Sequence, residues 1–274
     1  MKTIVITGAS DGIGAAAAKE LTRRKHRVVI VGRDPDKTAA VAARIGAEHH
    51  VADFADLDQV RALASALRER HDRIDVLANN AGGVMGERAL TVDGYERTFQ
   101  VNHLAPFLLT HELLPVLRDS RATVIQTSSL AARLYAKFDI ADLQGEFSFD
   151  PMAAYGNAKL ANILFTEELQ RRHGDALSAV SFHPGVVGTN FAADARGAIR
   201  FLYHGPLKRL LTRTPDKGAD QLIWLATATP GAGFEPGAFH IDRKVATKVN
   251  PLVGDAVTAL ELWERSAALL GINA

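Results

Sequence analysis

A phenol and an amine lie four residues apart in the chain, at Tyr155 and Lys159. Four residues make about one helical turn, so both side chains would emerge on one face of a helix. A phenol ionises near pH ~10, and a positive charge ~4 Å away stabilises the phenolate by about 4 kcal/mol at an effective dielectric of ~20. This would bring the pKa of Tyr155 toward neutrality and allow proton exchange with a substrate. Because the same spacing is common on ordinary amphipathic helices, the neighbouring motifs decide between the two interpretations.

Two serines precede Tyr155 in the chain, where the apolar run Thr123–Thr127 is followed by Ser128 and Ser129. If this run is a strand of a parallel sheet, its carboxyl end is where ligands bind in open α/β folds. A hydroxyl at that edge can donate a hydrogen bond to a substrate oxygen. The chain therefore offers a hydrogen-bond donor to work beside the phenol and the amine.

A glycine-rich turn follows the apolar run Thr3–Thr7 and precedes the alanine-rich segment Ala15–Leu21. Glycines let a backbone approach a pyrophosphate, and the N-terminus of the next helix offers free N–H groups and a positive dipole end. An ordinary strand-to-helix turn also uses glycine, yet this position favours nucleotide binding. The candidate cofactor residues are Gly8, Ser10, Asp11, Gly12, Ile13 and Gly14.

The choice of cofactor is expected at the end of the second strand, which reads Val31-Gly32-Arg33. An acidic residue there would accept hydrogen bonds from a free ribose 2′-hydroxyl and repel a 2′-phosphate. Arg33 can instead pair with a phosphate through two N–H groups. The alternative is a solvated surface arginine, and Asp34 leaves room for NAD(H). The sequence predicts NADP(H) as the preferred cofactor and NAD(H) as the alternative.

The elements that must position these residues alternate between short β-branched runs and longer stretches of helical period. Such runs are apolar throughout, as expected when helices cover both faces of a parallel sheet. Right-handed crossovers then predict a doubly wound α/β fold of Rossmann type. No repeat or linker divides the chain, so residues 1–274 are predicted to form a single dinucleotide-binding domain. The predicted strands are Thr3–Thr7, Arg27–Val31, Ile74–Ala78, Thr123–Thr127 and Ala179–Phe182.

The Gly-x-x-x-Gly-x-Gly turn and the Tyr155-x-x-x-Lys159 pair together resemble the short-chain dehydrogenase/reductase family. The resemblance implies hydride transfer between a nicotinamide and a carbonyl or alcohol, with Tyr155 and Lys159 also contacting the cofactor. It aligns Ser129, and not Ser128, with the catalytic serine of the family. Ser128 then remains a structural turn residue.

The family resemblance gives Asn102 a fourth catalytic role. Asn102 falls inside a long helix predicted from Gly94 toward Leu117. A polar amide in an apolar helix is usually satisfied locally. In the family, this position holds a water molecule beside the lysine, which implies a proton relay from Lys159 to solvent.

Further cofactor contacts also follow from the resemblance, although each has a plain structural alternative. An Asn/Gly turn, a carboxylate at a helix start and a Pro-Gly turn are common without any ligand. Asp11 stands where many NADP-preferring relatives carry a basic residue, which weighs against NADP(H). The implied contacts are Asn80, Ala81 and Gly82 for the adenine ribose, Asp53 with Phe54 for adenine, and Pro184, Gly185, Val187 and Thr189 for the nicotinamide.

The likeness covers the whole chain and narrows toward the retinol dehydrogenase-like branch of the family. That branch acts on retinoids, steroids and lipid aldehydes and includes a carbon–carbon double-bond reductase, so a hydrophobic carbonyl or alcohol is the expected substrate. Its membrane-anchored retinoid enzymes carry an N-terminal apolar segment, whereas this sequence begins with the strand-like run after Met1-Lys2. The motifs are Val101–Thr110, Asp142–Gly145, Lys159–Asn162 and Leu262–Ser266.

Composition and spacing exclude several other functions. A net charge of +1 gives no field to attract nucleic acid or an anionic membrane, and the absence of cysteine removes thiolate chemistry. His111-Glu112 begins a zinc-protease pattern, but Pro115 stands where the second histidine belongs. Ser129 does not stand in the Gly-x-Ser-x-Gly elbow of a serine hydrolase, because its neighbours read Thr127-Ser128-Ser129-Leu130-Ala131. A non-catalytic NADP-binding regulator stays open, although such a protein would tolerate loss of the serine, tyrosine and lysine.

The remaining expectations concern location, assembly and substrate access. No apolar stretch of ~18 residues occurs, so we expect a cytoplasmic protein without a stable membrane anchor. A homodimer or homotetramer follows from family resemblance alone. Residues at about 192–214 interrupt the strand–helix alternation with apolar and aromatic side chains, which suggests a substrate lid.

Overall fold

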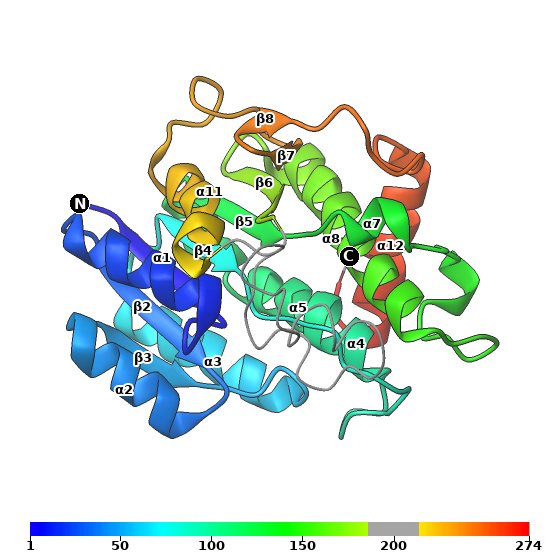
Figure 1. The fold of residues 1–274 in the computed structure, drawn as a ribbon, viewed down its shortest axis with the longest axis horizontal. Coiled ribbons are helices and arrows are strands. Elements are labelled where there is room, and N and C mark those ends of the chain that lie inside the picture. The colour runs from blue at the N-terminus through cyan, green and yellow to red at the C-terminus, as the bar shows by residue number, and fades with distance from the viewer. Residues whose placement is uncertain (186–213, 274) are drawn as a thin grey trace.

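Eight strands form one sheet in the order β3-β2-β1-β4-β5-β6-β7-β8 in the computed structural model, which describes residues 1–185 and 214–273 (Figure 1). The strands from β3 to β7 pair in parallel, and β8 runs antiparallel to β7. The strand order reverses beside β1, so the chain leaves β1 and β4 in opposite directions and a ligand crevice opens above their carboxyl ends. The strands are β1 (Thr3–Thr7), β2 (Arg27–Gly32), β3 (Glu48–Val51), β4 (Val76–Asn79), β5 (Thr123–Thr127), β6 (Ser178–His183), β7 (Phe239–Ile241) and β8 (Lys244–Val245).

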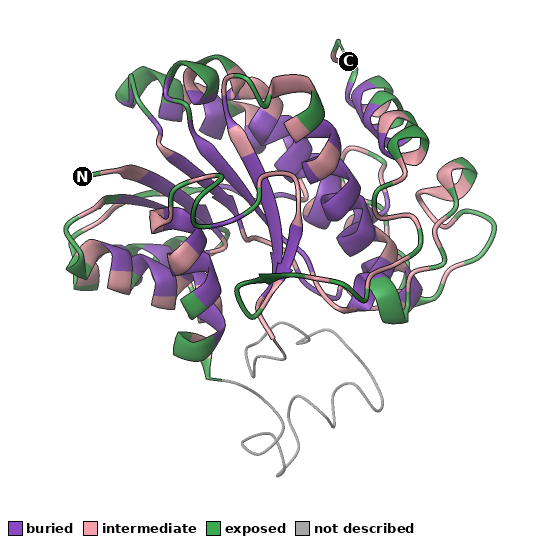
Figure 2. Ribbon diagram, turned by 90° about the horizontal axis from the view of Figure 1, so that it is seen from above, coloured by how far each residue is buried: buried purple, intermediate pink, exposed green. Residues whose placement is uncertain are grey.

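Helices cover both faces of the sheet, and Figure 2 shows the buried strands between two helical layers whose outer surfaces are exposed. One layer contains α1 (Gly12–Arg23), α2 (Pro35–Ile45) and α11 (Pro215–Thr227). The other contains α3 (Leu57–Arg70), α5 (Ala105–Glu112), α8 (Pro151–His173) and α12 (Ala256–Leu270). Shorter pieces are α4 (Arg97–Phe99), a π-helical turn (Gln100–Leu104), α6 (Leu114–Asp119), α7 (Ala131–Leu134) and a 3₁₀ turn (Ile140–Asp142).

The central strands are buried on both faces, which is why their sequences show no polar alternation. In β1, Ile4 and Ile6 pack toward the α1 layer while Val5 packs toward the α3 layer, and all three are fully buried. The predicted single-domain, doubly wound α/β fold is confirmed. The five predicted strands are all present: Thr3–Thr7 and Thr123–Thr127 have the predicted bounds, and the ends of the other three differ by one or two residues.

The strands at the sheet edges were not among those predicted. β3 pairs with β2 only, and its sequence Glu-His-His-Val alternates between half-buried and exposed residues, because successive side chains point to opposite faces of the sheet. β7 and β8 have three and two residues, too few for a periodic pattern. A search for continuous apolar runs therefore finds the centre of this sheet and misses its edges.

The prediction of one long helix from Gly94 toward Leu117 is wrong, because the helix starts later and is interrupted. It begins at Arg97, because Glu96 caps it by accepting hydrogen bonds from the N–H groups of Thr98 and Phe99. The π-helical turn follows, since Pro106 has no N–H to continue the α-helical ladder. Pro115 causes a second break between α5 and α6 in the same way.

The proposed lid at about 192–214 lies outside the described residues, except for Thr214, which caps α11. Val187 and Thr189 lie outside them as well.

Candidate active site

A cleft of about 590 Å³ lies over the carboxyl ends of the central strands, a volume within the usual range for a small-molecule site. Among the described candidates, Gly14 and Asn102 lie behind its wall and do not line it. The predicted site residues that do line it are Gly8, Ser10, Asp11, Gly12, Ile13, Arg33, Asp53, Phe54, Asn80, Ala81, Gly82, Ser129, Tyr155, Lys159, Pro184 and Gly185.

The glycine turn after β1 has no room for side chains. Gly8 has a φ of +65°, and a Cβ added to it would lie 2.8 Å from the Cα of Ala81. A Cβ on Gly14 would lie 2.4 Å from the carbonyl oxygen of Gly8. Gly14 thus lets α1 pack against the turn, while Gly8 brings two backbone loops together at the cleft. This cradle and the N-terminus of α1 fit a dinucleotide pyrophosphate.

Asp11 occupies part of that helix N-terminus. Its carboxylate accepts a hydrogen bond of 2.7 Å from the N–H of Gly12 and caps α1. The carboxylate also lines the cleft. It therefore places a negative charge near the site where a pyrophosphate would bind.

The loop after β4 is tied to the end of β1. The hydroxyl oxygen of Thr7 accepts hydrogen bonds of 3.0 Å from the N–H groups of both Asn80 and Ala81. The side-chain amide of Asn80 donates to the carbonyl of Thr7 at 2.9 Å. Asn80 is therefore a structural residue of the turn as well as part of the cleft wall. These contacts fix the two loops that flank the strand-order reversal.

Charged residues gather where the cleft meets the end of β2. Arg33 is exposed and lines the cleft together with Asp34 and Lys37. Asp34 caps α2 by accepting a hydrogen bond of 3.0 Å from the N–H of Lys37, whose ammonium lies 3.9 Å from the same carboxylate. Lys37 was missed from the sequence, although its place in the first turn after a helix cap was a usable signal.

Asp53 and Phe54 close this half of the cleft. Asp53 follows β3 and accepts a hydrogen bond of 3.0 Å from the N–H of Ala55. Its own N–H donates to the side chain of Gln59 at 3.0 Å. Phe54 is buried beneath it. The carboxylate of Asp53 is therefore held by the local turn and still lines the cleft.

Tyr155 and Lys159 lie on α8 and are 4% and 2% exposed. The helix starts at Pro151 because Asp150 caps it, accepting a hydrogen bond of 2.7 Å from the N–H of Ala153. The Lys159 ammonium lies 5.6 Å from the centre of the Tyr155 ring and donates to the carbonyl of Thr127 at 3.1 Å. Both side chains line the cleft.

Burial lowers the pKa of Lys159 from its ordinary value of 10.5 to about 7. The cause is loss of hydration, which disfavours the charged ammonium. The single carbonyl contact does not replace a full hydration shell. A lysine in this state is sensitive to any negative charge that forms beside it.

The two serines after β5 have different surroundings. The Ser128 hydroxyl is buried and donates to the carbonyl of Lys159 at 2.7 Å, so it joins β5 to α8. The Ser129 hydroxyl accepts a hydrogen bond of 3.1 Å from the N–H of Ala131 and keeps its own proton for donation. This difference favours Ser129 as the residue that meets a substrate.

Asn102 lies in the π-helical turn, fully buried. Its amide exchanges hydrogen bonds of 3.0 Å with the backbone N–H and carbonyl of Gly83 and donates to the carbonyl of Thr98 at 2.8 Å. A Cβ on Gly82 would lie 2.4 Å from the Asn102 oxygen and 3.1 Å from the Lys159 nitrogen. Asn102 therefore stands next to Lys159 across Gly82 and fixes this loop. Its expected water-holding role remains a prediction.

An apolar wall lines the same cleft as the reactive side chains, and sequence reasoning missed it. Leu134 and Tyr135 are 56% and 47% exposed although they line the cleft. Their residue types are ordinary, and only the fold brings them beside Tyr155, so no local signal could have found them. The wall consists of Val84, Met85, Leu134, Tyr135 and Met152.

Within residues 1–185 and 214–273, no cluster of three or more His, Asp or Glu side chains could hold a metal ion. Over the same ranges, no helix is both long enough and apolar enough to cross a bilayer.

Comparison with known proteins agrees with this geometry. The sequence profile of the short chain dehydrogenase family matches residues 2–199. The chain belongs to the short-chain dehydrogenase family. It is therefore an oxidoreductase of the class that exchanges hydride between a nicotinamide cofactor and an alcohol or ketone.

Named relatives place this short-chain dehydrogenase within the retinol dehydrogenase-like branch, as expected. A protein from Streptomyces sp. (strain C5), whose assigned name is daunorubicin C-13 ketoreductase, is 41% identical over 100% of this chain and 94% of its own. Human retinol dehydrogenase 13 is 35% identical over 100% of this chain and 86% of its own. An uncharacterised protein from Mycobacterium paratuberculosis has a solved structure with a TM-score of 0.79 and 33% identity, over 100% of this chain and 94% of that chain.

Proposed function

We propose that this protein is an NADP(H)-dependent oxidoreductase that transfers hydride between the nicotinamide and a hydrophobic carbonyl or alcohol. The observation that carries the proposal is one continuous cleft, which runs from the glycine turn to Ser129, Tyr155 and Lys159. The cradle at Gly8 fits the pyrophosphate of the cofactor. The nicotinamide, when bound, supplies or accepts the hydride.

Three side chains act on the substrate oxygen in this proposal. Ser129 donates a hydrogen bond to it, and Tyr155 gives it a proton in reduction or removes one in oxidation. Lys159 lies close enough to stabilise the phenolate that proton donation leaves behind. Because this coupling is mutual, the phenolate also raises the pKa of Lys159 and favours its charged form. Deprotonation of Tyr155 and protonation of Lys159 therefore favour each other.

The preference for NADP(H) is supported by the cations at the end of β2. Arg33 and Lys37 both border the cleft there, and two cations can hold a 2′-phosphate. The carboxylate of Asp34 is engaged by the first turn of α2. The negative charge of Asp11 disfavours the additional phosphate of NADP(H). NAD(H) is therefore the alternative to be measured.

A hydrophobic substrate is supported by the apolar side chains that line the same cleft as Tyr155. The thioethers of Met85 and Met152 are adaptable packing surfaces, and Leu134 and Tyr135 offer apolar area that is exposed without a ligand. Relatives named for a ketone substrate and for retinol agree with this class. The cytoplasmic location and the homo-oligomeric state remain predictions.

A panel of hydrophobic aldehydes, ketones and alcohols, assayed with NADPH, NADH and their oxidised forms, tests the proposal. We expect NADPH oxidation with carbonyl substrates and a lower rate with NADH. Binding of NADPH without turnover of any panel member would favour the non-catalytic regulator. Reduction of the double bond of an enone, with its carbonyl left intact, would favour a carbon–carbon double-bond reductase.

A further inference from the structure

We propose that His183 is a positioning residue that holds the Ser129 turn against the end of β6. The kinetic part of this inference rests on the proposed function, whereas its structural part does not. His183 is the last residue of β6, and Pro184 and Gly185 continue from it along the cleft wall. One imidazole therefore connects the turn that carries the serine to the strand that leads to the nicotinamide side.

The two amides that flank Ser129 both bind the end of β6. The N–H of Ser128 donates to the carbonyl of Phe182 at 2.8 Å, which continues the ladder between β5 and β6. The N–H of Leu130 lies beyond that ladder and donates to the Nδ1 atom of His183 at 3.3 Å. Ser129 is thus bracketed by one backbone contact and one side-chain contact. Without the imidazole, the turn would be tied to β6 on one side only.

His183 is itself held from the opposite side by a buried amide. Gln221 of α11 donates to the carbonyl of His183 at 3.4 Å and to the carbonyl of His240 at 3.0 Å. Its side-chain oxygen accepts the N–H of Arg243 at 2.8 Å. Gln221 therefore joins the ends of β6 and β7 to the turn before β8. The backbone that carries the imidazole is fixed before any ligand binds.

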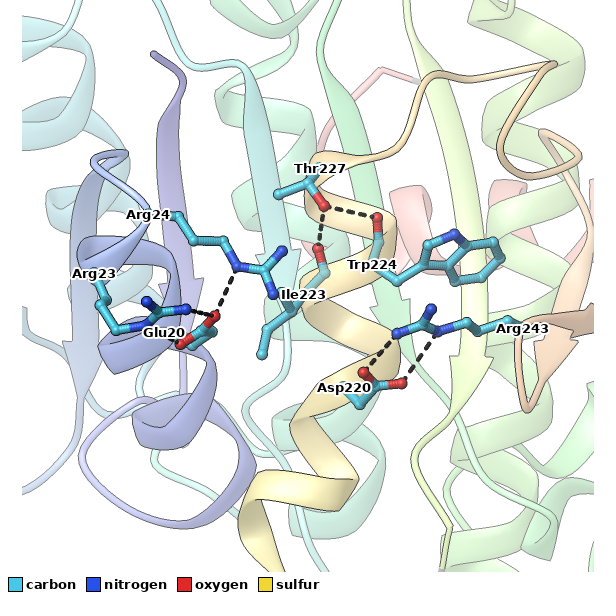
Figure 3. A network of polar contacts seen from close by, with 8 residues as sticks. All are labelled: Glu20, Arg23, Arg24, Asp220, Ile223, Trp224, Thr227 and Arg243. Atoms are coloured by element: carbon cyan, nitrogen blue, oxygen red, sulfur yellow. Dashed lines mark hydrogen bonds and ion pairs between the residues drawn. The ribbon is translucent and has the colours of Figure 1, made fainter.

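The turn between β7 and β8 is anchored by charge and by an aromatic ring. Asp242 and Arg243 adopt positive φ values of 49° and 62°, which non-glycine residues hold only when the surroundings require it. The Arg243 guanidinium donates to both carboxylate oxygens of Asp220, at 2.5 and 3.1 Å, and lies 5.9 Å from the Trp224 ring (Figure 3). These contacts hold the turn before β8 against α11, the helix that carries Gln221.

Support for the Ser129 turn matters because catalysis depends on where the serine hydroxyl lies. A displacement of about 1 Å in a positioning contact can cost on the order of 100-fold in rate. To accept the Leu130 N–H, Nδ1 must carry no proton, so the imidazole acts in its neutral Nε2–H form. An asparagine oxygen can occupy the Nδ1 position, whereas a glutamine amide reaches only the Nε2 position.

The test compares His183→Asn, His183→Gln and His183→Leu in the full chain. Three quantities are measured: kcat with the best carbonyl of the panel, the affinity for NADPH, and hydrogen exchange at the Leu130 amide in the cofactor-free protein. We expect His183→Leu and His183→Gln to lose about 10- to 100-fold in kcat, with NADPH affinity changed less than threefold. His183→Asn should stay within about threefold of wild type. The Leu130 amide should exchange at least tenfold faster in the leucine and glutamine variants only.

Different contrary results would distinguish failure of the His183 inference from failure of the proposed function. Wild-type exchange at Leu130 in His183→Leu would overturn the inference, whether or not the protein turns over a carbonyl. Rescue by glutamine and not by asparagine would also overturn it, because the working atom would then be Nε2. If exchange follows the expected order but wild type oxidises no NADPH with any carbonyl, the proposed function fails while the positioning contact stands.

Discussion

At the scale of single residues, Lys159 combines a chemical role with a cost to folding. Its buried ammonium has a pKa of about 7, against 10.5 for an ordinary lysine. Between these values the folded protein binds fewer protons than the unfolded chain, so stability rises with pH across this window. Below about pH 7 both states are protonated, and the folded state bears the full cost of burying the charge. The site thus retains a group that destabilises the fold near neutrality.

Replacing Lys159 with methionine should therefore abolish turnover and stabilise the cofactor-free protein. We expect a gain of about 1–4 kcal/mol in unfolding free energy at pH 6.5, shrinking as the pH approaches 10. Urea unfolding measures the free energy of unfolding at pH 6.5 and at pH 9.5. Lys19→Met on the exposed surface of α1 is the control and should leave the free energy of unfolding unchanged at both pH values. A Lys159→Met protein less stable than wild type at pH 6.5 would contradict the buried-charge argument.

Arg33 decides the cofactor in this account. Arg33→Ala should weaken NADPH binding about 10- to 150-fold, since a charged hydrogen bond contributes about 1.5–3 kcal/mol, and should leave NADH binding nearly unchanged. Fluorescence titration with each reduced cofactor gives the two dissociation constants. Arg44→Ala, an exposed arginine of α2 away from the cleft wall, provides the control. Equal weakening for NADPH and NADH would remove Arg33 from the choice between them.

At the scale of elements, the site depends on helix ends and on one irregular turn. The sequence predicted the strands whose apolar runs reflect burial on both faces, and it predicted the glycine turn because its chemistry is local. It did not predict the π-helical turn, because this turn arises from a missing N–H at Pro106 within a continuous apolar stretch. Asn102 reaches the loop at Gly83 from this turn.

The cap of α8 offers a test at this scale. Asp150→Ala removes the acceptor for the Ala153 N–H and should cost about 1 kcal/mol of stability. Because Tyr155 lies in the second turn of the same helix, we also expect a severalfold loss of kcat. Thermal unfolding and steady-state kinetics measure the two effects. Asp255→Ala, which removes the cap of α12, should lower stability similarly with kcat unchanged. An equal kcat in the two variants would show that the cap of α8 does not affect catalysis.

At the scale of the whole molecule, the strand-order reversal beside β1 brings distant segments to one cleft. The cofactor half could be predicted, since its residues follow individual strands and carry recognisable motifs. The apolar lining of the cleft could not, because Leu134, Tyr135 and Met152 become neighbours only when α7 and α8 pack over the same strands. The contact between His183 and Leu130 has the same origin, since 53 positions separate them in the chain.

The central claim is that hydride passes from the nicotinamide to a carbonyl carbon while Tyr155 supplies the proton. NADPH carrying deuterium at both positions of nicotinamide C4 tests it directly with the preferred carbonyl of the panel. We predict one deuterium on the carbinol carbon of the wild-type product, and less than one-hundredth of that rate from a Tyr155→Phe protein that binds NADPH equally well. Equal deuterium transfer by both proteins would contradict the account.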